Sequence, residues 1–141
     1  MKVIIDTNVA MDFMSDRQPH SDMAEKVFTF CCSELAEGYM TANSLCDLNY
    51  ILGKCLKDKE QKKSIISFWH HFIRILDTGD VDISHALSSD MDDFEDAVIA
   101  SVAARNRCDY IVTRNVKDFE KSPVPAVTPE EFIPIAMRQD L

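Results

Sequence analysis

The chain contains few residues that interrupt regular structure. Only three glycines and five prolines occur among its 141 residues, and no low-complexity tract or internal repeat is present. Pro123 and Pro125 mark a late loop rather than a linker between domains. Because 46% of the residues are hydrophobic, the chain can bury one core, and we expect a single globular domain over residues 1–141.

Long apolar stretches are also missing. No segment approaches the roughly 20 apolar residues that a membrane-spanning helix needs, and no basic region followed by a long apolar segment opens the chain. We therefore expect a soluble, cytoplasmic protein without a membrane partner. The five cysteines show no C-x-x-C spacing, and His70 and His71 are neighbours that point in different directions on a helix. Reduced cysteines are expected, and a zinc site is not.

Positive charge is absent from one long segment. Residues 75–104 contain eight acids and no lysine or arginine, in a chain of net charge −9. The excess negative charge is therefore local, and a nucleic-acid partner is not excluded. Ten of the fifteen basic residues form two groups elsewhere, which are Lys54, Lys57, Lys59, Lys62 and Lys63, and then Arg105, Arg107, Arg114, Lys117 and Lys121. A solvated helix surface is the simpler interpretation of the first group.

Hydrophobic periodicity predicts alternating strands and helices. Apolar runs predict short strands at residues 3–5, 39–41, 73–76, 110–113 and 126–128, and helical spacing predicts helices at 7–14, 21–37, 43–55, 59–72, 81–87 and from Phe94 onward. Gly38 is expected to end the second helix, and Pro129 suits the first position of a last one. This alternation predicts an α/β fold with a central, mostly parallel sheet of about four to five strands flanked by helices.

Carboxylates stand at two places where chemistry is expected. Asp6 follows the first strand directly, and ligands of open α/β sheets bind where strands end, although an aspartate there can equally cap the next helix. Asp93 and Asp96 are three positions apart and Asp92 and Asp96 are four apart, so each pair is expected to share a helix face at its N-terminal end. Two carboxylates about 4 Å apart repel by about 4 kcal/mol at an effective dielectric constant near 20, which exceeds what a helix dipole returns. Such a cluster requires a proton or a cation.

Convergence of Asp6 with Asp96 would surround one point with oxygen ligands. Hard oxygen donors select Mg²⁺ or Mn²⁺, and a metal-bound water is a nucleophile suited to phosphodiester hydrolysis.

Three segments together resemble a PIN domain, the nuclease fold of VapC-type toxins from bacterial toxin/antitoxin modules. Their order and spacing span nearly the full chain. The segments are Ile5-Asp6-Thr7-Asn8-Val9, Asp93-Phe94-Glu95-Asp96-Ala97 and Ile111-Val112-Thr113-Arg114-Asn115-Val116-Lys117-Asp118-Phe119.

The resemblance implies metal ligands at individual positions. Asp6 and Asp96 match two metal-binding acids of the family, and Asp93 matches a frequent additional acid. Asp47 falls where most members have glutamate, so its reach is one methylene shorter. Asn115 falls where aspartate is common, and Asp118 is the nearby acid that would replace it. These five aspartates are the predicted catalytic residues, with Asp6, Asp47, Asp93 and Asp96 as metal ligands.

The remaining predicted site residues would position substrate or water. Two roles are open for Thr7, Asn8 and Thr113: they either position water or cap and close turns. Asn115 is predicted to position substrate. Arg114 either contacts an RNA phosphate or pairs with neighbouring acids.

The resemblance also implies an activity. It predicts an Mg²⁺- or Mn²⁺-dependent endoribonuclease, the toxin of a type II toxin/antitoxin module. A homodimer and a small antitoxin that covers the acidic cleft are the implied partners. The alternative is a PIN-like module that binds RNA or protein with weakened or no nuclease activity, which Asp47 and Asn115 favour.

Overall fold

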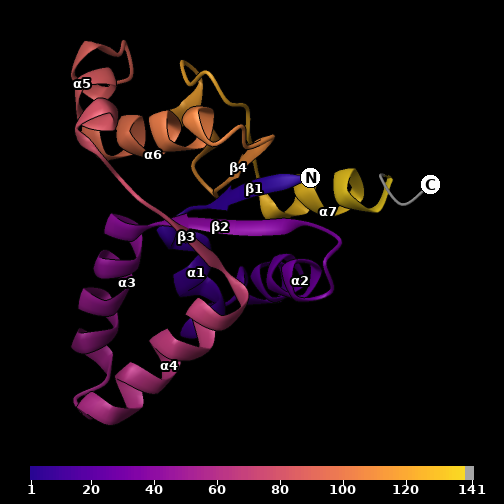
Figure 1. Cartoon of the computed structure of the whole chain (residues 1–141). Helices are drawn as coiled ribbons and strands as arrows, with labels where there is room; N and C mark the ends of the chain where they lie inside the picture. The colour runs from indigo at the N-terminus through magenta and orange to yellow at the C-terminus, as the bar shows by residue number, and fades with distance from the viewer. Residues whose placement is uncertain (139–141) are drawn as a thin grey trace.

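A five-stranded sheet forms the centre of the molecule in the computed structural model, which describes residues 1–138 (Figure 1). The strands stand in the order β3-β2-β1-β4-β5, and all four neighbouring pairs are parallel. Their bounds are β1 Lys2–Ile5, β2 Glu37–Thr41, β3 Arg74–Leu76, β4 Tyr110–Val112 and β5 Ala126–Val127. The predicted α/β fold with a parallel sheet is confirmed.

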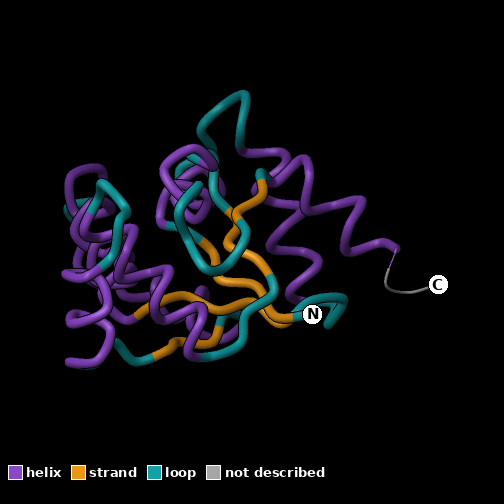
Figure 2. The backbone as a smooth tube through the Cα atoms, turned by 90° about the horizontal axis from the view of Figure 1, so that it is seen from above, coloured by secondary structure: helices purple, strands orange, loops and turns teal. Residues whose placement is uncertain are grey.

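Helices cover both faces of this sheet (Figure 1), and a view from above shows the orange strands among purple helices (Figure 2). Helices α1 to α4 lie on one side, and α5 and α6 lie on the other (Figure 1). Their bounds are α1 Thr7–Met14, α2 Ser21–Cys32, α3 Ala42–Cys55, α4 Lys59–Phe72, α5 Asp80–Ser88, α6 Phe94–Arg105 and α7 Pro129–Arg138. Pro129 opens α7 as predicted, whereas the 3-10 turn η1 (Val116–Phe119) is not predicted by the sequence pattern. No helix within residues 1–138 is long and apolar enough to cross a membrane.

The central strand β1 contributes to two separate cores. Val3 and Ile5 pack with α1, α2, α3, α4 and α7, whereas Ile4 packs with α5 and α6 on the opposite face. Side chains alternate between faces along a strand, and both faces are buried here. That double burial explains why the strand reads as an uninterrupted apolar run.

The second helix ends earlier than its sequence predicts. Helix α2 stops at Cys32, and Gly38 lies inside β2, so the prediction that Gly38 ends a helix over 21–37 is wrong. The left-handed residue after the helix is Glu34, with φ of 62°. A Cβ atom on Gly38 would lie 2.6 Å from Sγ of Cys31 and 2.8 Å from Cδ1 of Ile73. This glycine therefore permits the close approach of α2 to the sheet.

The order in which strands are added to the sheet reverses at β1. Strands β2 and β3 lie on one side of β1, and the later strands β4 and β5 lie on the other. Because all strands are parallel, their carboxyl ends share one rim of the sheet. Such a rim, at the point where the strand order reverses, is where α/β proteins bind ligands.

Candidate active site

A cavity of about 520 Å³ opens at the carboxyl end of β1. Six acids line it, which are Asp6, Asp47, Asp93, Glu95, Asp96 and Asp118, together with two arginines, Arg17 and Arg114. Thr7, Asn8 and Asn115 line it as well. Of the residues predicted for the site, only Thr113 is not part of this lining, and Thr113 lies fully buried against Asp6. The fold thus brings together residues that are more than 100 positions apart in the sequence.

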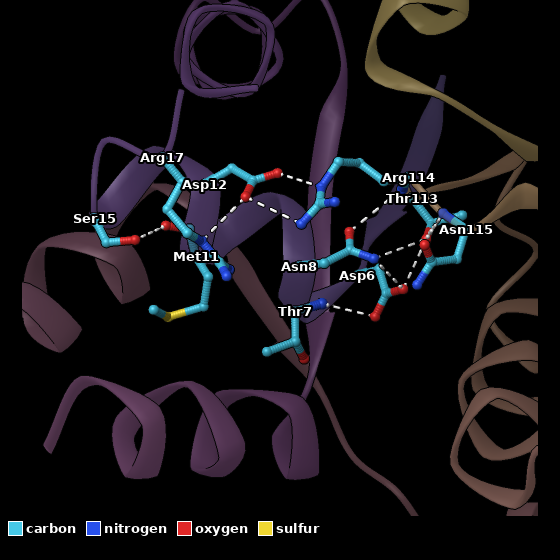
Figure 3. A network of polar contacts seen from close by, with 10 residues as sticks. All are labelled: Asp6, Thr7, Asn8, Met11, Asp12, Ser15, Arg17, Thr113, Arg114 and Asn115. Carbon is cyan, nitrogen blue, oxygen red and sulfur yellow. Dashed lines mark hydrogen bonds and ion pairs between the residues drawn. The ribbon is translucent and has the colours of Figure 1, made fainter. Parts of the chain in front are cut away.

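Asp6 caps a helix and faces the cavity at the same time. Its Oδ1 accepts a hydrogen bond of 2.8 Å from the N–H of Thr7, which makes it the N-cap of α1. Its Oδ2 accepts hydrogen bonds from the Thr113 hydroxyl at 2.8 Å and from Nδ2 of Asn8 at 3.4 Å (Figure 3). Burial raises the pKa of Asp6, and the negative charges of Asp118 and Asp93 raise it further against those hydrogen bonds.

Thr113 joins the ends of the two central strands. Its hydroxyl donates to Asp6 and accepts from Nδ2 of Asn8 at 3.3 Å and from the N–H of Asn115 at 3.1 Å. Asn8 in turn accepts from the N–H of Arg114 at 3.3 Å through Oδ1. Thr113 and Asn8 therefore hold the Asp6 carboxylate in one orientation. Both side chains also hydrogen-bond to backbone N–H groups of the turn after β4, so contacts of both predicted kinds are present.

Helix α6 delivers the second group of acids. Asp93 is its N-cap and accepts a hydrogen bond of 2.9 Å from the N–H of Asp96. Asp96 is half-buried, and its carboxylate accepts no hydrogen bond from residues 1–138. Burial, followed by the charges of Asp6, Asp93 and Asp118, raises the pKa of Asp96 to about 7. The predicted convergence of Asp6 with Asp96 is therefore present, and the two carboxylates repel each other across the cavity.

Asp47, Asn115 and Asp118 complete the lining from more exposed positions. Asp47 projects from α3, and Asp118 belongs to η1, where its backbone N–H donates to the carbonyl of Asn115 at 3.0 Å. All three side chains are exposed. Glu95, whose charge also raises the pKa of Asp96, belongs to the clustered acids of the sequence but is not among the predicted site residues.

The donor chemistry of the cavity fits a hard divalent cation. Carboxylate oxygens from separate elements face one volume, and their mutual repulsion would be relieved by a positive ion. Within residues 1–138, however, no three His, Cys, Asp or Glu side chains are close enough together to form a complete metal centre. Mg²⁺ keeps several of its waters when it binds, so one or two direct carboxylate ligands with others bridged by water are compatible with this spacing.

Asp12 and Arg17 are functional candidates that sequence reasoning missed. Asp12 lies in α1 with only 1% of its side chain exposed and forms ion pairs with two arginines. Nε of Arg114 donates to Oδ2 of Asp12 at 2.6 Å, and Nε of Arg17 lies 3.2 Å from its Oδ1 (Figure 3). Arg114 therefore forms an ion pair with a neighbouring acid, which is one of the two roles predicted for it. The available signal was an acid inside the apolar segment 9–12 of a short helix.

The lysines and the aromatic residues of the segment from α3 to α4 differ in exposure. The lysines of residues 54–63 lie on the arm formed by α3 and α4, which projects away from the sheet (Figure 1), and all but Lys62 are exposed. Trp69 is buried with 1% exposure, whereas Phe68 is 48% exposed and therefore only partly a packing residue.

Comparison with solved structures finds proteins of similar fold. A chain of the VapBC2 complex from Rickettsia felis, solved with a promoter DNA fragment, matches with a TM-score of 0.70 at 20% identity, covering 91% of this chain and 98% of that one. A chain of FitAcB from Neisseria gonorrhoeae matches with a TM-score of 0.68 at 17% identity, with coverages of 91% and 98%. VapC20 of Mycobacterium tuberculosis, a toxin that cleaves the sarcin-ricin loop, matches with a TM-score of 0.60 at 10% identity, with coverages of 77% and 86%.

These structural matches establish the fold, and the sequence itself supplies the family. A comparison with curated proteins finds no match. The family model described as PIN domain matches residues 2–117, which include β1, the acids of α6 and the end of β4. The chain therefore belongs to the PIN domain family.

Proposed function

We propose that this protein is a metal-dependent endoribonuclease that hydrolyses RNA phosphodiester bonds with Mg²⁺ or Mn²⁺. The observation that carries the proposal is the convergence of Asp6, Asp93, Asp96 and Asp118 on one cavity, where burial, followed by the charges of the other three acids, raises the pKa of Asp96 to about 7. A site that holds unpaired acids at this cost is suited to a cation, and perturbed carboxylates in a cavity are typical of active sites. Membership in the PIN domain family supports nuclease activity.

In this proposal Asp6, Asp93 and Asp96 would hold the cation, and Asp47 would contribute from α3. When bound, the ion supplies a polarised water and neutralises charge on a phosphate oxygen. Thr113 and Asn8 keep the Asp6 carboxylate aimed at the cavity, because both hydrogen bonds restrict its rotation. Asp96 would have to be ionised to hold the ion, and Asp118 with Asn115 would orient water and substrate at the exposed rim. Thr7 anchors the second oxygen of Asp6 through its N–H.

A second candidate, a PIN-like binding module with little or no cleavage, is favoured by two observations. The acids of residues 1–138 do not form a complete metal centre as they stand, and Asp47 and Asn115 are both exposed. A neutral Asn115 also lowers the number of anionic ligands.

We further propose that the protein is the toxin of a type II toxin/antitoxin module. Solved complexes of this fold, VapBC2 and VapBC from Salmonella typhimurium among them, support an antitoxin partner. Six acids against two arginines line the cavity, so a basic side chain from a small antitoxin would bind there. An apolar groove of about 350 Å³ between α1 and α4, lined by Phe13, Met14, Ile65 and Phe68, is suited to the same partner.

A homodimer completes the proposal. Helix α5 exposes Val81, Ile83 and Leu87, with 46%, 36% and 73% of each residue accessible, and an apolar cavity of about 590 Å³ is lined by residues of both α5 and α6. Exposed apolar side chains gathered on one element are typical of protein interfaces.

Cleavage assays test the enzymatic proposal. The purified protein is incubated with single-stranded and structured RNA in Mg²⁺, in Mn²⁺ and in EDTA, and cleavage is expected only with metal. Asp6→Asn should abolish cleavage while the helix keeps a good N-cap, and Asp22→Asn, an exposed acid on α2, is the matched control that should stay active. Equal cleavage by wild type and Asp6→Asn would refute the proposal.

Calorimetric titration separates the two candidates. Mg²⁺ binding that Asp96→Asn weakens supports the nuclease, whereas tight RNA binding without measurable Mg²⁺ or Mn²⁺ binding supports the binding module.

A further inference from the structure

The acidic cavity contains one positively charged corner. Arg17 and Arg114 are the only basic residues among those that line it within residues 1–138. Both lie against the same buried carboxylate, that of Asp12, so two guanidinium groups share one negative charge. This group of three residues therefore carries an excess positive charge at the edge of a cavity whose other charged groups are acids.

The two arginines are held differently. Arg114 binds Asp12 through two nitrogens, with Nε at 2.6 Å from Oδ2 and a terminal nitrogen at 3.3 Å from Oδ1. Arg17 approaches through Nε alone, at 3.2 Å, and 47% of its side chain is exposed. Within residues 1–138 the terminal nitrogens of Arg17 form no hydrogen bond, and Arg17 belongs to the cavity lining, so these donors are available to a ligand there.

The backbone of Arg17 is fixed even though its side chain is not enclosed. Its N–H donates to the carbonyl of Asp12 at 3.1 Å, and its carbonyl accepts from the N–H groups of His20 and Ser21 at 3.0 and 2.9 Å. Asp16 before it adopts the left-handed conformation, with φ of 49°. The turn between α1 and α2 thus presents Arg17 at a defined place beside the carboxylates.

We propose that Arg17 binds a backbone phosphate of the RNA strand next to the bond that is cleaved, with Asp12 and Arg114 as the residues that position it. The inference rests on the proposed ribonuclease function. A planar guanidinium with unpaired donors matches the oxygens of a phosphate diester, which lysine would bind only as a point charge. An RNA strand offers successive phosphates, so one can occupy the acidic part of the cavity with its cation while its neighbour meets Arg17.

Binding measurements with a labelled 12-nucleotide single-stranded RNA test this assignment. All variants carry Asp6→Asn and are measured in EDTA, so cleavage does not interfere and the result is independent of nuclease activity. Arg17→Gln should lower the slope of log affinity against log salt by about 0.7, which corresponds to about fivefold weaker binding at 0.1 M salt. Arg17→Lys should keep the slope, since the charge remains. Arg74→Gln, at a 72% exposed arginine outside the cavity lining, is the matched control and should change neither quantity.

Three results would overturn the proposal, and a second measurement is available if the variant does not fold. An unchanged slope for Arg17→Gln, or an equal loss for Arg74→Gln, would show that Arg17 makes no specific phosphate contact. Intact RNA binding combined with lost binding of a glutamate-rich peptide would assign Arg17 to a protein partner instead. If Arg17→Gln fails to fold by circular dichroism, the Nε–H resonances of the parent protein decide the question, because RNA should shift that of Arg17 and leave that of Arg74 in place.

The experiments distinguish refutation of the phosphate contact from refutation of the proposed ribonuclease function. Metal-dependent cleavage with no effect of Arg17→Gln on RNA binding refutes only the phosphate contact. RNA binding that depends on Arg17, without cleavage by the wild type under any metal, refutes only the nuclease.

Discussion

Replacing Asp96 by asparagine should stabilise the metal-free protein at neutral and alkaline pH. The carboxylate of Asp96 accepts no hydrogen bond from residues 1–138, so the substitution breaks none, and it removes a charge that Asp6, Asp93 and Asp118 repel. Below the ordinary pKa of 3.8, Asp96 is protonated in both the folded and the unfolded chain. Between about pH 4 and 7 only the unfolded chain has lost the proton, so wild-type stability falls as the pH rises, and above about pH 7 the full cost is present.

The size of this effect follows from the pKa of about 7. At about 1.36 kcal/mol per pH unit, the rise from 3.8 sets an upper limit of about 4 kcal/mol. Asp96 is only half-buried, so solvent screens its neighbours and we expect about 1–2 kcal/mol. For a chain of this length that corresponds to roughly 3–6 °C in melting temperature.

Thermal unfolding in EDTA at about pH 4 and about pH 8 measures the effect. Asp96→Asn should melt several degrees above wild type at the higher pH and close to it at the lower. Asp22→Asn is the control and should show no such pH-dependent gain. Adding Mg²⁺ at the higher pH should raise the melting temperature of the wild type more than that of Asp96→Asn, because bound cation favours the folded state. A variant no more stable than wild type in EDTA at about pH 8 would refute the electrostatic account of the site.

Three further substitutions test the fold, the network around Asp6 and the proposed dimer. Gly38→Ala should lower the free energy of unfolding by about 1–3 kcal/mol in urea titration, since its Cβ would lie 2.6 Å from Sγ of Cys31; unchanged stability would contradict the close packing of α2 on the sheet. Thr113→Val should cost about 1–3 kcal/mol in the same assay, because Asp6 loses its hydroxyl donor in a buried site, and a stability equal to wild type would show that this hydrogen bond is not needed. Leu87→Glu should convert a homodimer to monomer in light scattering without lowering the melting temperature of the monomer, whereas an intact dimer would place the interface elsewhere.

Local patterns in the sequence are sufficient for most elements of the fold. The apolar runs that form β1 and β4 are buried on both faces, and the spacing of Phe94, Ala97, Val98 and Ser101 marks α6. The prediction for Gly38 is wrong because the reason for this glycine is tertiary. Glycine is common after helices, but this one is required by the approach of α2 to the sheet, and no local pattern encodes that contact.

Some residues of the candidate site can be recognised from the sequence and others cannot. Acids that directly follow a strand or begin a helix can be recognised from their positions in the sequence, and this is why Asp6, Asp93 and Asp96 are predictable. Asp12 and Arg17 are not, because an acid within a short helix and an arginine in a turn have no chemical meaning until folding brings Arg114 to the same carboxylate.

By itself, then, the sequence determined the α/β class, the parallel sheet and the residues that carry negative charge, since periodicity and strand-end chemistry are local properties. Only the tertiary structure decided how those charges act. The strand order places the ends of β1 and β4 side by side, next to the beginning of α6. The burial and the proximity that result, which no local interaction specifies, raise the pKa of Asp96 and pair Asp12 with two arginines.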